Sequence, residues 1–229
     1  GVIGTLLHVT IIAILVFHAP RLGRYSTEGI VVLAGAFLIA EGWLNAIVIP
    51  NMRHIFEQFR LGNIDVLLAR PGDLQLILTF EKFELQNGFS ALFGVVFLFV
   101  YLILEAEFPL QNLVPFVFLV AVGLALLLQF GFVCILLSFF IPQRNGISLF
   151  ASSCFDLARF PIDVYPNWLF GVLITVFPFY YATSLPTEVL FGISPVSATL
   201  VALGCLFVGF GVGRILLRMV TLSYKSFGG

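Results

Sequence analysis

The sequence predicts an all-α polytopic membrane protein, and three observations support this fold class. Hydrophobic residues make up 60% of the 229 residues, charged residues only 10%, and the mean hydropathy is +1.11. Apolar runs recur that approach or exceed the ~20 helical residues needed to cross a hydrocarbon core of ~30 Å. Polar segments rich in Pro and Gly separate these runs. We therefore interpret residues 1–229 as a single transmembrane domain with little water-soluble structure.

Six spans are predicted from the positions of the apolar runs. The first run, residues 2–17, is short, and we interpret it as the second half of a longer span. The next run is expected to end where Pro50 and Asn51 close it. The five spans after the first are placed at residues 29–49, 88–104, 113–140, a run ending near 160, and 196–217.

Prolines break the apolar region from residue 147 to residue 190. Backbone groups that proline frees at membrane depth need partners from neighbouring protein or from a water-lined cavity. We predict one span up to about Phe160 and then a pair of short re-entrant helices, in an extracytoplasmic broken-helix region at 161–193. An interfacial helix plus a span over 147–183 is the alternative. In the last span, Gly209 and Gly213 have the spacing that lets helices pack closely.

The distribution of Lys and Arg predicts the orientation. If residues 50–87 form a cytoplasmic loop, eight basic residues lie on the inner side and three on the outer side, as the positive-inside rule requires. Both chain ends then face the cytoplasm. The inner set is Arg53, Arg60, Arg70, Lys82, Arg144, Arg214, Arg218 and Lys225, and the outer set is Arg21, Arg24 and Arg159.

An amphipathic helix is predicted at the start of the inner loop. Apolar Ile55, Phe56 and Phe59 recur at helical spacing, and Gly62 is expected to end the helix. We expect this helix to lie along the inner membrane face. It either docks into a groove of another protein or is a plain interfacial helix, and the residues leave both readings open. Its polar side carries Arg53, Glu57 and Arg60.

Several functional classes lack their sequence signals. The chain has no Gly-Lys dipeptide and therefore no phosphate-binding loop, so the energy for any transport comes from a partner or an ion gradient. No Lys/Arg run indicates nucleic-acid binding. The three cysteines and three histidines are dispersed and predict neither a metal site nor a disulfide framework. No cluster of nucleophile and base predicts an enzyme.

Two sets of polar residues lie within apolar segments. Glu41 and Asn45 are one helical turn apart in the second span, and they either line a pathway for a polar or cationic substrate or make a structural hydrogen bond. Asp156 and Arg159 form an i, i+3 pair that we expect to clamp the broken external helices.

Two motifs resemble those of the permease subunits of ABC-2 type exporters, in the group that has two related permeases per ATPase. Residues 60–71 (Arg-Leu-Gly-Asn-Ile-Asp-Val-Leu-Leu-Ala-Arg-Pro) are similar to the family's basic-Gly-x-hydrophobic-Asp-x-x-Leu-x-basic-Pro loop. Residues 159–169 (Arg-Phe-Pro-Ile-Asp-Val-Tyr-Pro-Asn-Trp-Leu), followed by Phe177-Pro178, are similar to its Arg-aromatic-Pro and aromatic-Pro pattern. The resemblance covers essentially the whole chain.

This resemblance implies a permease that moves a hydrophobic or amphipathic compound out of the cell across the bacterial plasma membrane. Two copies of an ABC ATPase would bind ATP and Mg, with no cofactor in this chain, and a second, related permease would complete a heterodimer. An N-terminal amphipathic helix and the start of span one would precede Gly1. The residues implied to couple the permease to the ATPase are Arg53, Phe56, Phe59, Arg60, Gly62, Asp65, Arg70 and Pro71. The residues implied to form the external clamp are Asp156, Arg159, Pro161, Tyr165 and Pro166.

Two other functions remain as alternatives. An ion-coupled secondary transporter would normally show broken helices in both halves of the chain, whereas one such region is visible in the sequence. A structural membrane subunit of another complex is the second alternative.

Overall fold

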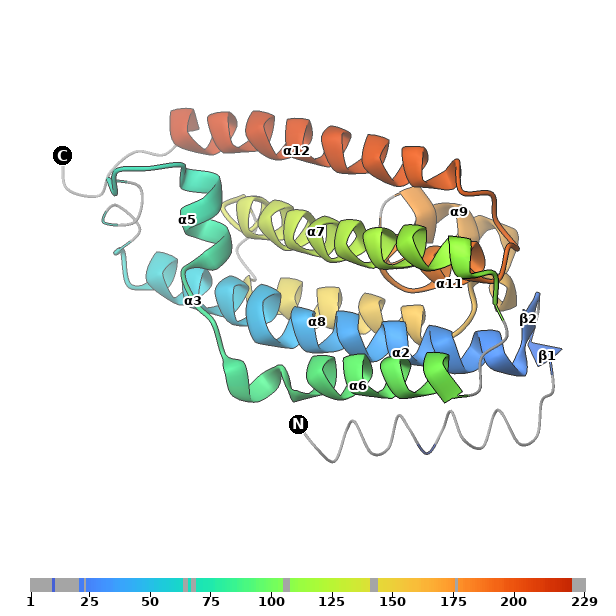
Figure 1. The fold of residues 1–229 in the computed structure, drawn as a ribbon. Coiled ribbons are helices and arrows are strands. Elements are labelled where there is room, and N and C mark those ends of the chain that lie inside the picture. Colours follow the sequence, from blue (N-terminus) through green and yellow to red (C-terminus); the bar gives the residue numbers. More distant parts are fainter. Residues whose placement is uncertain are drawn as a thin grey trace.

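Long helices that run side by side form the fold (Figure 1). The computed structural model describes residues 10, 21–22, 24–63, 66, 69–104, 108–140, 144–175 and 177–223. The longer elements are α2 (Thr27–Trp43), α3 (Ile49–Arg60), α6 (Phe89–Leu104), α7 (Leu113–Leu137), α8 (Arg144–Asp156) and α12 (Ala198–Ser223). The short helices are η1 (Leu44–Val48), α5 (Leu74–Phe80), η2 (Leu85–Asn87), η3 (Leu110–Asn112), η4 (Leu157–Arg159), η5 (Ile162–Val164), α9 (Asn167–Thr175), α10 (Phe179–Ala182) and α11 (Ser184–Leu190). The strands β1 (Arg21–Leu22) and β2 (Tyr25–Ser26) form a small antiparallel hairpin.

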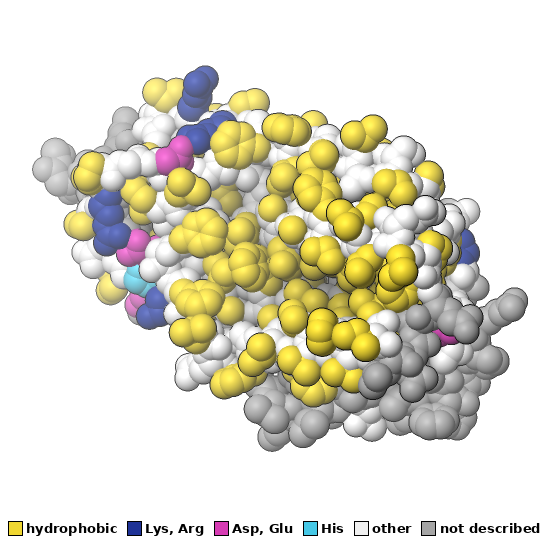
Figure 2. All heavy atoms as spheres, viewed as in Figure 1, with side chains coloured by type: hydrophobic (Ala, Val, Ile, Leu, Met, Phe, Trp, Pro, Cys, Tyr) yellow, Lys and Arg dark blue, Asp and Glu magenta, His cyan; other side chains and the backbone are white. Residues whose placement is uncertain are grey.

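The surface and the helix lengths are those of a membrane protein. Among the residues that the structure describes, three helical stretches are long and apolar enough to cross a bilayer, Thr27–Phe59, Leu110–Leu137 and Ala198–Leu222, and α6 is a shorter apolar helix. Apolar side chains cover the middle of the face in Figure 2, and charged side chains lie toward its ends. The predicted all-α membrane class is confirmed, with the hairpin β1–β2 as a small addition. The number of six spans stays a prediction.

The helix that begins with α2 does not end at Pro50, so the expectation that Pro50 and Asn51 close the second span is wrong. The π-helical turn η1 joins α2 to α3. Proline has no N–H, so it leaves the carbonyl of Ala46 without its usual partner four residues on. The N–H of Glu84 donates to that carbonyl at 2.9 Å. The helix can therefore continue, because a π turn relieves the crowding of the ring and a distant residue satisfies the freed oxygen.

Asn51 anchors the returning chain, residues 82–84, beside the π turn. Its buried amide Nδ2 donates to the carbonyl oxygens of Ile47 at 2.8 Å and Lys82 at 2.7 Å, and its Oδ1 accepts from the Lys82 N–H at 2.7 Å. The side chain uses both donors and its acceptor on the backbone. Residues 82–84 are thus fastened to the junction of η1 and α3.

Helix α3 is amphipathic, and it continues the helix that begins with α2. Ile55 and Phe56 are buried in the protein core, whereas Arg53 is exposed. Gly62 has φ of +74°, and the N–H groups of Gly62 and Asn63 bond back to Phe59 and Gln58, so the predicted end of the helix is confirmed. A stretch of 33 residues is about 50 Å long, more than the ~30 Å hydrocarbon core. The placement of this helix along the inner membrane face stays a prediction, and the structure shows that its apolar side packs on the bundle.

Glycines let neighbouring helices approach closely. A Cβ on Gly94 of α6 would lie 2.9 Å from the Gly35 carbonyl oxygen of α2. Cβ atoms on Gly209 and Gly213 would each lie 3.1 Å from side-chain atoms of α7, those of Gln129 and Phe132 respectively. The close packing predicted for the last span is thus confirmed, and its partner is α7.

The chain between α8 and α12 is divided into short elements, as the prolines predict. Aromatic side chains fill the space beneath them. The ring of Phe155 stacks on Phe37 of α2 at 5.0 Å and meets Phe179 edge to face at 5.3 Å, and Phe130 of α7 contacts both Phe177 and Phe179. The motif Phe177-Pro178 therefore lies inside an aromatic cluster that joins α2, α7 and α8 to the start of α10. The placement of α9–α11 as re-entrant helices stays a prediction.

Candidate functional site

Two groups of polar residues lie at opposite ends of the helix bundle. One is near the hairpin β1–β2 and α11, and the other is near α3, α5 and the C-terminal end of α12 (Figure 1). We call them the hairpin-end site and the loop-end site.

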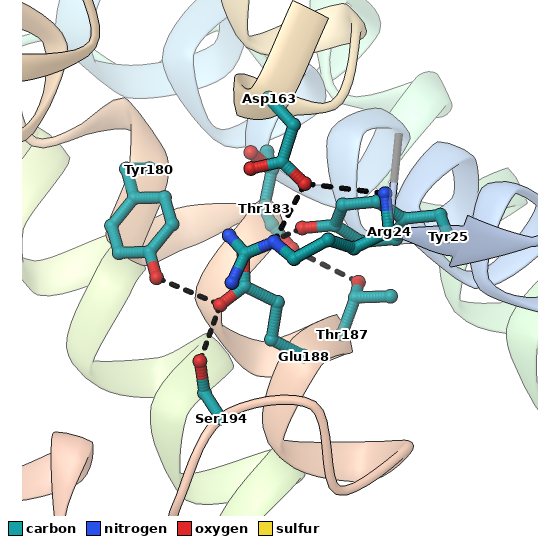
Figure 3. A network of polar contacts seen from close by, with 8 residues as sticks. All are labelled: Arg24, Tyr25, Asp163, Tyr180, Thr183, Thr187, Glu188 and Ser194. Carbon is teal, nitrogen blue, oxygen red and sulfur yellow. Dashed lines mark hydrogen bonds and ion pairs between the residues drawn. The ribbon is translucent and has the colours of Figure 1, made fainter. Parts of the chain in front are cut away.

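Glu188 of α11 is the centre of the hairpin-end site, and its side chain is fully buried. Figure 3 shows how donors from different elements converge on its two oxygens. Oε1 accepts from the hydroxyl of Tyr25 at 2.8 Å and from Nη2 of Arg24 at 3.2 Å. Oε2 accepts from the hydroxyls of Tyr180 at 2.9 Å and Ser194 at 2.5 Å. Each carboxylate oxygen therefore has two partners, which offsets the large cost of burying a charge.

Arg24 extends this network to a second carboxylate. Its Nε donates to Oδ2 of Asp163 at 2.7 Å, and its backbone N–H donates to the same oxygen at 3.3 Å. The hydrogen bond with Asp163 raises the pKa of Arg24, and burial raises the pKa values of Tyr25 and Tyr180. At neutral pH the guanidinium is therefore charged and both phenols are protonated donors. The site joins the hairpin, η5, α10 and α11.

The sequence analysis missed Glu188. Its partners Arg24 and Tyr25 lie 164 and 163 residues away, so no local spacing indicates the contact. The available signal was a single carboxylate in an apolar segment between Pro186 and Pro195, a placement that usually indicates a paired or functional group.

The residues predicted as the external clamp lie beside this site. Oδ1 of Asp156 accepts from Nη2 of Arg159 at 2.9 Å, but this pair links neighbours in one stretch of chain, and Asp156 is 60% exposed. The guanidinium of Arg159 also lies over the ring of Phe37 at 5.5 Å. The Tyr165 hydroxyl donates to the Leu157 carbonyl at 2.8 Å and closes the turn there. Pro161 is buried in that turn, whereas Pro166 is exposed just before α9.

The loop-end site holds part of the predicted coupling set. Nη1 of Arg70 donates to Oε2 of Glu81 at 2.6 Å, and Nε2 of His54 lies 3.9 Å from the other oxygen of Glu81. Pro71 is exposed beside Arg70, which presents this corner at the surface. Asp65 lies outside the described residues. Phe59 meets Phe139 edge to face at 4.8 Å, so Phe56 and Phe59 pack inside the protein, while of Arg60 only the backbone is described.

Asp73 connects this loop to the last helix. Its Oδ1 accepts from the backbone N–H groups of Gln75 at 2.8 Å and Leu76 at 3.4 Å, which caps α5, and its Oδ2 accepts from Arg214 of α12. The hydrogen bond from Arg214 holds the pKa of Asp73 below its ordinary value. Asp73 is thus an ionised link between α5 and α12 at neutral pH.

Glu41 and Asn45 lie at the end of α2 and in η1, and both side chains are half-buried. Neither belongs to the hairpin-end or loop-end site. A separate apolar groove of about 530 Å³ lies between α7, α9, α10 and α12, with Gln129, Tyr181 and Cys205 among its lining residues. Such a volume suits a small apolar or amphipathic molecule.

The chain was compared with protein families, with curated proteins and with solved structures. A family model described as ABC-2 family transporter protein matches residues 2–228. No curated protein and no solved structure matches the chain.

Proposed function

We propose that this chain, which belongs to the ABC-2 family of transporter proteins, is the permease subunit of an ATP-driven exporter. The chain is a multi-pass membrane protein and a membrane permease of an ABC transporter, and this family associates with an ABC ATPase. In our proposal two copies of the ATPase bind ATP and Mg and drive export of a hydrophobic or amphipathic compound across a bacterial plasma membrane. A second, related permease completes the complex.

The match over residues 2–228 is the observation that carries the proposal, and it confirms the resemblance seen in the two sequence motifs. The loop-end site supports the role of the ATPase. Helix α3 continues past the length that a bilayer needs and ends at Gly62, and the exposed corner at Arg70 and Pro71 follows. A long helix that ends near a charged corner can transmit a movement of a soluble partner into the bundle.

Affinity purification of the chain from membranes tests the proposal. We expect an ABC ATPase and a second permease to copurify, and the complex to hydrolyse ATP. A purified monomer that moves a lipophilic dye under an ion gradient without nucleotide would contradict it and would favour a secondary transporter.

The orientation can be tested by labelling single cysteines. In a background without Cys134, Cys154 and Cys205, we expect cysteines at Asn63 and Asn167 to react with an impermeant maleimide from opposite sides of the membrane, because both positions are exposed. Intact cells should label only the Asn167 position, and inverted vesicles only the Asn63 position. Labelling of both positions from one side would refute the orientation.

We expect Asp65→Ala and Arg70→Ala to weaken ATPase binding without unfolding the permease. Each change removes a charge that we expect to contact the ATPase. One charge-assisted contact contributes about 1.5–3 kcal/mol, or roughly a ten- to hundredfold change in affinity. Binding of the purified ATPase to the permease in nanodiscs measures this effect.

Glu81→Gln is the matched control for Arg70→Ala, because it removes the same internal ion pair and keeps the Arg70 charge. An exposed ion pair contributes about 0–1 kcal/mol, so the Glu81 variant should bind the ATPase nearly normally. Equal loss in both variants would show that the ion pair, and not the Arg70 charge, supports binding.

A further inference from the structure

Helix α5 belongs to the loop at residues 50–87, yet two of its polar side chains reach helices far along the chain. Asp73 binds Arg214 of α12, and Nε2 of Gln75 donates to Oε1 of Gln129 on α7 at 2.8 Å. Nε2 of Gln129 in turn donates to the carbonyl oxygen of Gly209 on α12 at 2.8 Å. A continuous chain of polar contacts thus runs from α5 through α7 to α12.

The two glutamines are unusual in an apolar bundle. Gln75 is 7% exposed and Gln129 is 8% exposed. Among the residues that the structure describes, Oε1 of Gln75 has no hydrogen-bond partner. A buried acceptor without a partner raises the free energy of the arrangement that contains it. Gln75 therefore holds α7 through its Nε2 donor alone, because its oxygen makes no hydrogen bond with the described residues.

Gln129 also lies at the contact between α7 and α12, where Gly209 and Gly213 permit close approach. Its side chain forms part of the wall of two hollows. One, of about 280 Å³, lies between α5, α7 and α12 and is lined by Asp73, Gln75 and Arg214 among others. The second is the apolar groove of about 530 Å³. The Gln129 contact thus borders two mostly apolar hollows, and the smaller one also has the polar side chains of Asp73 and Arg214 in its wall.

We propose that α5 is a latch on the contact between α7 and α12, with Gln129 as the residue that it holds. In the latched state the contacts Asp73–Arg214 and Gln75–Gln129 keep the two helices together. Movement of the 50–87 loop by the ATPase withdraws α5, frees Gln129 and joins the two hollows. The joined space takes an amphipathic molecule, because its walls are mostly apolar and the part beside α5 adds the charged groups of Asp73 and Arg214. This inference rests on the proposed function for the source of the movement.

Spin-label distances test the latch. Leu76 of α5 and Ile215 of α12 are 60% and 62% exposed, so nitroxide labels on cysteines there should not disturb the packing. With the three native cysteines removed, the permease–ATPase complex in nanodiscs is measured without nucleotide and after trapping with ATP and vanadate. We expect the distance between the labels to lengthen on trapping. A label pair at Leu76 and Phe80, both exposed on α5, is the control and should keep its distance.

A second variant makes the test independent of the ATPase. Asp73→Asn combined with Gln75→Leu should give the longer distance in the permease without nucleotide or ATPase, whereas Gln86→Leu, at an exposed position of η2, should not. An unchanged distance in a complex that hydrolyses ATP would overturn the latch and leave the proposed function intact. Failure of the ATPase to bind would contradict the proposed function. If the double variant still gave the longer distance in that case, the result would support the latch.

Discussion

Glu188→Ala should be among the most destabilising single substitutions in this protein. The change removes the acceptor of Tyr25, Tyr180 and Ser194 and leaves Arg24 with one carboxylate partner. Breaking a buried pair by removing one partner costs about 3–5 kcal/mol, because the other groups stay buried without their bonds. For a chain of this size that loss lowers the melting temperature by on the order of 10 °C. Thermal unfolding in detergent measures it.

Asp156→Asn is the control for this prediction, because Asp156 also pairs with an arginine near the same site but is 60% exposed. Exposed ion pairs contribute about 0–1 kcal/mol, so the melting temperature should change little. Glu188→Gln should lie between the two, since the amide keeps one acceptor oxygen and loses the charge. Similar melting temperatures for Glu188→Ala and Asp156→Asn would show that the buried network does not stabilise the fold.

Gly123→Ala should also destabilise the protein strongly, through backbone contact and not through polarity. A Cβ on Gly123 of α7 would lie 2.5 Å from the carbonyl oxygen of Tyr181, and the backbone of Ala182 is equally close by. Backbone atoms cannot rotate away, so α10 must shift. Overpacking of this kind costs about 1–3 kcal/mol or more. The same unfolding assay reports it, and increased thiol reactivity of Cys205, which lines the neighbouring groove, would show that α10 has moved.

Gly204→Ala is the matched control, and its expected effect on stability has the opposite sign. Nothing lies within 4 Å of the Cβ position of Gly204 on α12. Alanine is favoured over glycine within a helix by about 1 kcal/mol, so this variant should be unchanged or slightly more stable. If Gly123→Ala and Gly204→Ala had equal effects, the close contact between α7 and α10 would not determine the packing there.

The family, the all-α membrane class and the end of α3 at Gly62 are confirmed. The coupling roles of Arg53 and Arg70 and the pathway role of Glu41 stay predictions. These roles depend on contacts with a partner protein or a transported compound, and such contacts are not part of the fold of this chain.

The sequence by itself determined the membrane class and the positions of α6, α7 and α12, because these depend on the length of apolar runs. It also determined the end of α3 and the breaks after α8, because Gly and Pro act on their own backbone. Only the tertiary structure decided that the helix continues past Pro50, because the needed N–H comes from Glu84 in the returning chain. It likewise decided that Arg24 meets Glu188 across 164 residues, since a buried hydrogen bond between distant segments follows from packing and not from spacing.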